Sequence, residues 1–214
     1  MKRRVAIVQT HSATNEELYR LTLPNHAEYA GTHSYDMIQL NSPWEDVRWN
    51  IWLWIGDLLK SYDHILSVGS DVIFTDMKKP LSFFVDSQYG VVISLADDGG
   101  SPINNELSLW NNNEKAFRVL EYVYGRRESL DHHPWIGQQA MWEFLQTSEG
   151  KDFIKTLPCR QLQSAPIQRF SSSAWQKGDF ALHFVGWSGV GTLNGDKMMR
   201  VKHFLETGKV MWWG

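Results

Sequence analysis

The chain of 214 residues contains a single cysteine, Cys159, so it can form neither an intrachain disulfide nor a thiolate zinc site. It also lacks an apolar run long enough to span a bilayer, since the longest, WNIWLWIGDLLK, is short and carries Asp57. The opening residues MKRR run directly into a strand-like segment, which is not the pattern of a signal peptide. We therefore expect a cytoplasmic protein that does not associate with membranes.

Basic residues are not in excess, because the chain has 21 Lys and Arg and 24 Asp and Glu, which give a formal net charge of -3. This balance gives no electrostatic reason to expect binding to nucleic acid or to an anionic membrane. Hydrophobic residues make up 43% of the chain, as in ordinary globular proteins. The length is sufficient for one substantial core, so we predict a single domain over residues 1–214.

Tryptophan is abundant, with 11 residues in the chain. Such side chains bury large apolar areas, and they also stack on sugar rings and bases. For any one tryptophan, packing in the core or on the surface is the more common role.

Apolar residues follow alternating strand and helix periods along the first 75 residues, which predicts an α/β fold with a mixed, mostly parallel sheet flanked by helices. Strands are expected at 4–11, 35–40, 64–74, 90–96, 105–110 and 178–187. Helices are expected at 12–33, 45–62, 113–124, 135–146 and 195–206. Pro24 is expected to interrupt the first helix or to start a second one.

Two predicted strands end in residues of types that can bind metals, an aspartate and a histidine. Asp71 follows an apolar run in HILSVGSDVIFTD, and His183 lies near the end of GDFALHFVGW. Ligands of open α/β sheets bind at the carboxyl ends of strands, and Mn²⁺ accepts both carboxylate and imidazole. The glycines of the loop 186–191 would let backbone N–H groups approach a phosphate. The alternative is a turn-capping Asp71 and a structural His183 in the core.

Six stretches, in order along the chain, resemble the retaining α-glycosyltransferases that include fungal galactosyl/mannosyltransferases and plant xyloglucan α-xylosyltransferases. They are LPNHAEYAGTHSYDM (23–37), HILSVGSDVIFTD (64–76), INNELSLWNNNE (103–114), WIGQQAMWEFL (135–145), LPCRQLQSAP (157–166) and WQKGDFALHFVG (175–186). The last is similar to the family's Gly-Asp-Phe-x-x-His-Phe-x-Gly signature. The resemblance implies a GT-A-type, Rossmann-like fold and a nucleotide-sugar-dependent enzyme that usually requires manganese, here without the family's membrane anchor.

The chain departs from the family pattern where that family does chemistry. Gly69 replaces the first aspartate of Asp-x-Asp, Gln138 replaces the aspartate of an Asp-Gln pair, and Gln163 replaces an asparagine. The glycine that follows the family's strand asparagine is Asn105 or Glu106 here. Loss of a carboxylate at Gly69 weakens the expected Mn²⁺ site, unless Asp76, Asp97 or water compensates.

The resemblance assigns roles to individual residues of this chain. Asp71 and His183 would hold the metal, and the catalytic candidates are Gln138, Asp97 and Asp98. Gln138 would steady positive charge at the anomeric carbon while the leaving phosphate takes the acceptor proton, a front-face route to retention. The expected donor-binding residues are Thr10, His11, Ser70, Asp71, Asn104, Gly186, Gly189 and Lys197.

The expected function is transfer of a sugar from a UDP- or GDP-sugar to a hydroxyl of a glycan, a protein or a modified nucleobase. A compact enzyme of this kind suits a bacterium or a virus. One alternative is a non-catalytic or weakly active module that binds sugar nucleotides or glycans, which Gly69 and Gln138 favour. Another is a transferase that acts on hydroxylated DNA bases, for which the acidic balance gives no support.

Overall fold

A six-stranded mixed sheet forms the centre of the protein, whose computed structural model describes residues 4–41, 44–96, 101–166, 172–185 and 192–211. The strand order is β2-β1-β3-β6-β5-β7, and every neighbouring pair is parallel except the two that involve β6. The strands are β1 (Val5–His11), β2 (Asp36–Asn41), β3 (His64–Val68), β5 (Val91–Leu95), β6 (Ile103–Asn111) and β7 (Ile154–Leu157). The mixed, mostly parallel α/β sheet predicted from the sequence is therefore confirmed.

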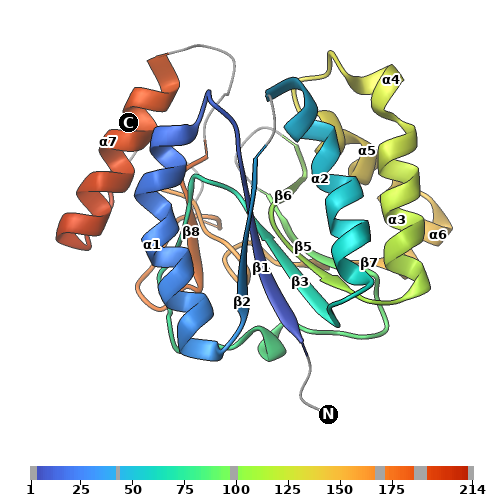
Figure 1. Ribbon diagram of the computed structural model, residues 1–214, viewed down its shortest axis with the longest axis horizontal. Coiled ribbons are helices and arrows are strands. Elements are labelled where there is room, and N and C mark those ends of the chain that lie inside the picture. The colour runs from blue at the N-terminus through green and yellow to red at the C-terminus, as the bar shows by residue number, and fades with distance from the viewer. Residues whose placement is uncertain (1–3, 42–43, 97–100, 167–171, 186–191, 212–214) are drawn as a thin grey trace.

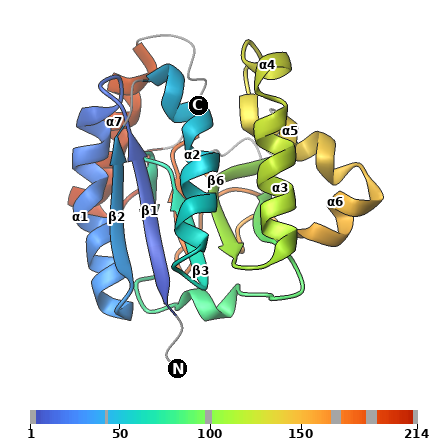
Figure 2. The same ribbon diagram turned by 45° about the vertical axis from the view of Figure 1, so that its right-hand side comes forward.

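Helices cover both faces of this sheet (Figures 1 and 2). Helix α1 (Glu16–His33) lies on one side with α7 (Thr192–Thr207) packed against it, and α2 (Trp44–Leu59), α3 (Glu114–Gly125) and α5 (Ile136–Leu145) lie on the other. The short elements are α4 (Arg127–Leu130), α6 (Ser148–Phe153) and the 3-10 helix η1 (Leu81–Phe83). Across the described ranges, none of the helices combines the length and apolar character needed to cross a bilayer.

Side chains of the central strands alternate between two cores, as the pleat of a strand requires. Ala6 and Val8 of β1 point into the core shared with α2, α3 and α5, whereas Ile7 points into the core beside α1. Ile65 and Leu66 of β3 divide in the same way. A sheet buried on both faces explains the nearly continuous apolar runs of these strands.

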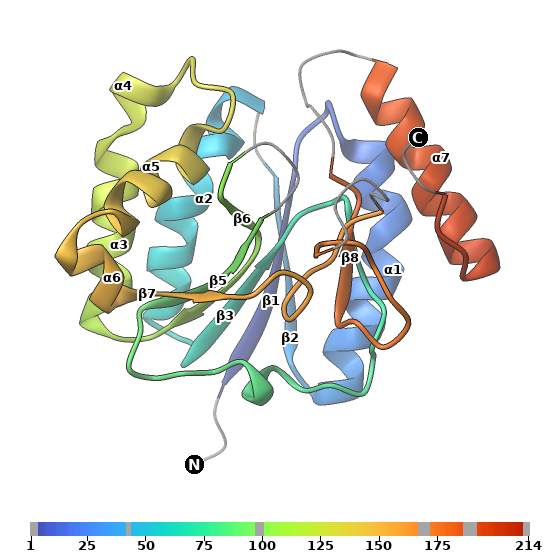
Figure 3. The same ribbon diagram turned by 180° about the vertical axis from the view of Figure 1, so that it is seen from behind.

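A second, two-stranded ladder lies beside α1 (Figure 3). It pairs β4 (Val72–Phe74) with β8 (Ala181–His183) in antiparallel register, so that Val72 faces His183. The prediction of one strand over 64–74 is therefore wrong, because the chain leaves the main sheet in a turn closed by Val72 N–H donating to Gly69 O. The strand predicted at 178–187 is also shorter, since only β8 is paired.

Pro24 lies inside α1, so the predicted interruption at this residue is wrong. Proline removes one helical hydrogen bond, but α1 is held by side-chain bonds to the segment that follows β3. Thr22 Oγ1 donates to Ser70 O at 3.0 Å, and His26 Nε2 lies 2.8 Å from Val72 O. Tertiary contacts thus favour one continuous helix over the break that local propensity predicts.

Asn25 of α1 binds the backbone of β4 with both ends of its amide. Its Nδ2 donates to Phe74 O at 3.0 Å, and its Oδ1 accepts from Phe74 N at 2.8 Å. This pairing replaces a missing strand neighbour on that side of Phe74, and it fixes the segment that begins at Asp71.

Replacement of Asn25 by alanine is expected to lower the free energy of unfolding by about 2–3 kcal/mol, because two backbone groups of Phe74 lose their partners. Urea denaturation of the variant measures this loss. Asn50→Ala in α2 is the matched control and should change stability by less than about 0.5 kcal/mol. Equal losses in the two variants would contradict the role given to Asn25.

Candidate functional site

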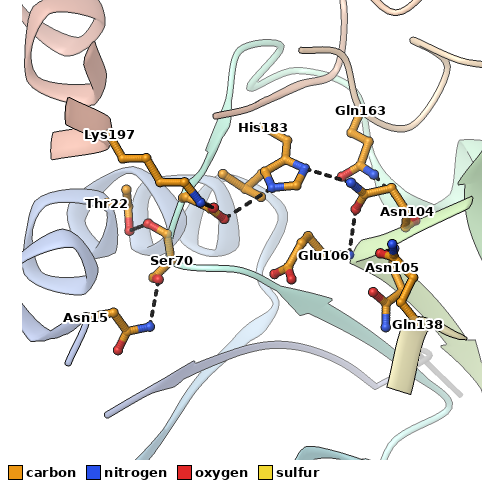
Figure 4. Close-up of polar contacts among 12 residues, drawn as sticks. Asn15, Thr22, Ser70, Asn104, Asn105, Glu106, Gln138, Gln163, His183 and Lys197 are labelled. Carbon is orange, nitrogen blue, oxygen red and sulfur yellow. Dashed lines mark hydrogen bonds and ion pairs between the residues drawn. The ribbon is translucent and has the colours of Figure 1, made fainter. Parts of the chain in front are cut away.

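The structure brings Asp71 and His183 together beside the β4–β8 ladder. Figure 4 shows His183 between Lys197 and Asn104. Asp71 follows β3, and His183 ends β8, whose register with β4 brings the two side chains together. Asp71 Oδ1 lies 3.4 Å from His183 Nε2, and both side chains are largely buried. The backbone N–H of Phe184 also donates to Asp71 O at 2.8 Å, which holds the two strand ends in place.

Lys197 joins this pair from helix α7. Its Nζ lies 2.6 Å from Asp71 Oδ2, and the side chain is buried. Burial opposes ionisation of the Asp71 carboxyl group, but the charge of Lys197 and the contact with His183 outweigh it and hold the pKa well below its usual value. Burial likewise acts to lower the pKa of Lys197, yet Asp71 and Glu106 raise it overall. The charged ammonium of Lys197 therefore lies against Asp71 Oδ2.

Asn104, at the start of β6, lies behind the imidazole of His183. Its Nδ2 is 3.2 Å from His183 Nδ1, and its Oδ1 accepts from the Glu106 backbone N–H at 3.0 Å. The amide therefore donates to Nδ1, which leaves the proton of a neutral ring on Nε2, facing Asp71. Cation binding at Nε2 requires that proton to move to Nδ1 and the Asn104 amide to turn over.

Glu106 is a functional candidate that the sequence did not identify. Because β6 runs antiparallel to β3, its first residues lie beside the last residues of β3, and Gly69 N donates to Glu106 O. A Cβ atom placed on Gly69 would overlap Glu106 Oε2 and lie 3.0 Å from Asp71 Oδ1. The Glu106 carboxylate thus fills the space in which a side chain at residue 69 would begin.

The Glu106 side chain keeps access to solvent, but its surroundings disfavour its charge. Crowding by protein atoms and the nearby negative charge of Asp71 raise the pKa of its carboxyl group. In the ranges that the structure describes, no hydrogen-bond or ion-pair partner contacts this carboxylate. Of the lysines in the described ranges, only Lys197 places its ammonium at these two carboxylates.

The predicted donor-binding residues of the first strand lie at the same edge of the sheet. Thr10 and His11 end β1, whose Gln9 pairs with Val68 of β3. Ser70 Oγ accepts from Asn15 Nδ2 at 3.0 Å, which ties the loop after β1 to the Asp71 segment.

His11 is already engaged within its own neighbourhood. Its ring stacks on Tyr19 with centroids 3.9 Å apart, and its Nδ1 lies 2.8 Å from Glu16 Oε2. These contacts present a flat aromatic surface next to the candidate site.

Gln138 and Gln163 border the cluster on the β6 side. Gln138 Oε1 accepts from Asn105 N at 3.3 Å, and Gln163 Nε2 donates to Asn104 O at 3.4 Å. Gln163 Oε1 is buried, and no described residue hydrogen-bonds to it, which leaves an acceptor for a polar ligand. Ile136, two residues before Gln138, has φ 38°, a strained value for a β-branched residue.

Four of the predicted residues cannot be compared with the cluster. Asp97, Asp98, Gly186 and Gly189 lie outside the described residues. Asp76, considered as a replacement for the missing carboxylate, follows the other end of β4 and pairs with Lys79 at 3.8 Å.

The donor set is chemically suited to a divalent cation. Within the described ranges, no three His, Cys, Asp or Glu side chains form a ready-made metal cage. Cations that act on nucleotide substrates are commonly held by one or two carboxylates together with phosphate oxygens, so a complete protein cage is not required. Asp71, Glu106 and His183 offer carboxylate and imidazole donors, a combination that Mn²⁺ accepts.

No protein-family model matches the chain, and no curated protein matches its sequence. Solved structures, however, share its fold. A glycosyltransferase involved in the glycosylation of the major capsid of PBCV-1 aligns with a TM-score of 0.71 over 93% of this chain and 98% of its own, at 17% identity. GlyE of Streptococcus pneumoniae TIGR4 gives 0.61 over 98% of this chain and 66% of its own, at 12% identity.

The galactosyltransferase LgtC, solved in complex with donor and acceptor sugar analogues, aligns with a TM-score of 0.52 at 10% identity, over 91% of this chain and 95% of its own. At such identities the likeness establishes the fold, and the chain therefore has the GT-A fold of these glycosyltransferases. The matches do not single out the fungal and plant family that the sequence motifs resemble.

Proposed function

We propose that the protein is a retaining glycosyltransferase that moves a sugar from a nucleotide-sugar donor to a hydroxyl acceptor. The observation that carries this proposal is the meeting of Asp71, His183 and Lys197 at the carboxyl end of β3 in a GT-A fold. Ligands of open α/β sheets bind at such strand ends. The cluster combines a cation-binding carboxylate with an ammonium, which are the groups that a diphosphate leaving group requires.

Lys197 is the phosphate-binding residue of this proposal. When the bond between the anomeric carbon and the phosphate oxygen breaks, negative charge develops on the diphosphate, and an ammonium stabilises it. Asp71 holds that ammonium within 2.6 Å before substrate binds, so its position is set in advance. A divalent ion held by Asp71 and His183 would act as a Lewis acid on the same diphosphate.

Gln138 is the residue proposed to face the anomeric carbon. In a front-face reaction the acceptor oxygen attacks from the side of the leaving group, and the leaving phosphate oxygen takes the acceptor proton. An amide oxygen opposite stabilises the developing positive charge without forming a bond. Because Gln138 carries no carboxylate, we propose no covalent glycosyl-enzyme intermediate.

The proposed acceptor is a hydroxyl of a glycan or of a protein. A structural neighbour takes part in glycosylation of a viral capsid, and LgtC was solved with an acceptor sugar analogue. No cluster of basic residues surrounds Asp71 in the described part of the chain, so a hydroxylated DNA base has less support as acceptor.

A panel of UDP- and GDP-sugars tests this proposal. In the presence of Mn²⁺, a cognate donor at 100 times its Kd should raise the free energy of unfolding by about 2.7 kcal/mol. The same donor concentration with a chelator in place of Mn²⁺ should give a smaller increase. Donor hydrolysis or transfer, followed by release of the nucleoside diphosphate, measures turnover. Stabilisation without turnover on any acceptor would indicate a non-catalytic module that binds sugar nucleotides. If no donor stabilises the protein, both the transferase and the binding module are contradicted.

A further inference from the structure

We propose that Glu106 holds the divalent cation together with Asp71. Glu106 lies on β6, and its carboxylate would replace the one that an aspartate at residue 69 supplies in the Asp-x-Asp motif. This inference rests on the proposed nucleotide-sugar site, and it adds to that site a ligand that the sequence motif does not contain. Three observations support it, namely the overlap between Glu106 and a side chain at residue 69, the unpaired state of its carboxylate, and its link to His183.

The first observation is spatial. A Cβ atom on Gly69 would overlap Glu106 Oε2 and lie 3.0 Å from Asp71 Oδ1, so the Glu106 carboxylate already stands beside Asp71. An aspartate at residue 69 and a glutamate at residue 106 would compete for one volume. The glycine is therefore what permits Glu106 to reach this place, and the two residues supply one carboxylate between them.

The second observation concerns charge. Asp71 and Glu106 together carry two negative charges when ionised, and among the described residues Lys197 and a protonated His183 oppose them at short range. Lys197 Nζ contacts Asp71, and the Glu106 carboxylate has no such contact in those ranges. A solvent-accessible carboxylate beside a second carboxylate, with no cation of its own, is suited to bind one from solution.

The third observation links Glu106 to the other proposed ligand. The Glu106 backbone N–H donates to Asn104 Oδ1, and Asn104 Nδ2 contacts His183 Nδ1. Metal-binding histidines donate a proton from their second ring nitrogen to an acceptor. Asn104 stands at that position, and with its amide turned over its Oδ1 would accept from His183 Nδ1 in place of the Glu106 N–H. Beside it, the buried Gln163 Oε1 has no hydrogen-bond partner among the described residues, which is consistent with a polar ligand at this place.

Binding of Mn²⁺ in the presence of UDP or GDP, measured by electron paramagnetic resonance of the free ion, tests the inference. Glu106→Gln keeps the shape of the side chain and removes its charge, and we expect the Kd for Mn²⁺ to rise by about tenfold or more. Glu128→Gln removes an equal charge from the surface helix α4 and should leave the Kd unchanged. Equal Kd values for the wild-type protein and Glu106→Gln would overturn the inference.

Relocation of the carboxylate provides a second test. Glu106→Ala should weaken Mn²⁺ binding, and adding Gly69→Asp should restore most of it, because the new side chain enters the vacated space. Thermal unfolding checks that each variant is folded, and Glu106→Gln remains decisive if the double variant is not. A double variant that is folded and binds Mn²⁺ no better than Glu106→Ala would overturn the inference.

The wild-type protein separates this inference from the function on which it rests. Donor binding or turnover that is independent of Mn²⁺ would overturn the role of Glu106 and leave the glycosyltransferase standing. Mn²⁺ binding that depends on Glu106, without turnover of any donor, would support the cation site alone. Binding of neither nucleotide nor Mn²⁺ would overturn both.

Discussion

Asp71→Asn is expected to weaken binding of the nucleotide-sugar donor by at least about a hundredfold. The amide cannot bind a cation with the strength of a carboxylate, and it no longer holds Lys197 at 2.6 Å. Removing one partner of a buried ion pair also lowers the free energy of unfolding by about 3–5 kcal/mol. Donor titration by calorimetry and urea denaturation measure the two effects separately.

Asp76→Asn is the matched control, because Asp76 lies past the other end of β4 and pairs with Lys79. It should bind the donor as the wild-type protein does. His183→Ala removes the proposed imidazole ligand without unpairing Lys197, so it should abolish metal-dependent donor binding at a smaller cost in stability. Unchanged donor binding in both Asp71→Asn and His183→Ala would show that the site lies elsewhere.

The unfolding free energy is expected to fall by about 3 kcal/mol between pH 7 and pH 4 through His26 alone. His26 is fully buried in α1, and burial lowers its pKa from 6.5 to about 4, against a smaller opposing effect of the Val72 carbonyl and the charge of Asp71. Since the unfolded chain takes up the proton first, stability is fully present above pH 6.5 and declines as the pH falls toward 4. Below pH 4 the contribution is constant.

The matched variant His26→Gln keeps a donor for the Val72 carbonyl and removes the titration. The stability difference between the wild-type protein and this variant, measured with urea at each pH, should shrink by about 3 kcal/mol from pH 7 to pH 4. A difference that does not change with pH would mean that the pKa of His26 is the same in the native and the unfolded protein. Such a result would remove the physical basis for this prediction.

The sheet was predictable because it depends on local patterns, whereas the contact between Asp71 and His183 is made through the β4–β8 ladder, which those patterns do not encode. Apolar runs mark the strands, and the carboxyl ends of strands gather polar residues at one edge. Lys197 was expected near a phosphate, but its contact with Asp71 depends on how α7 packs against α1, which no local pattern encodes.

Two errors and one omission have the same origin in tertiary structure. The segment 64–74 reads as one apolar strand, yet the Gly69–Asp71 turn moves β4 to a separate ladder with β8. Pro24 is typical of a helix break, yet α1 continues through it, because the next residue, Asn25, is hydrogen-bonded to Phe74 of β4. Glu106 was missed because its partner, Gly69, is distant in sequence and adjacent only through the reversed direction of β6.

The reversed direction of β6 has a consequence for how proteins of this kind diverge. Residue 69 directly follows β3, and residue 106 lies on the adjoining strand β6. Because their side chains would share one volume, a change at either alters what the other can accommodate. Among homologues we expect correlated substitution, in which an acidic residue at 69 accompanies a small residue at 106 and the reverse. A search for the Asp-x-Asp motif alone would classify such sequences as lacking a carboxylate. The site would nevertheless keep one, because residue 106 on β6 supplies it when residue 69 does not.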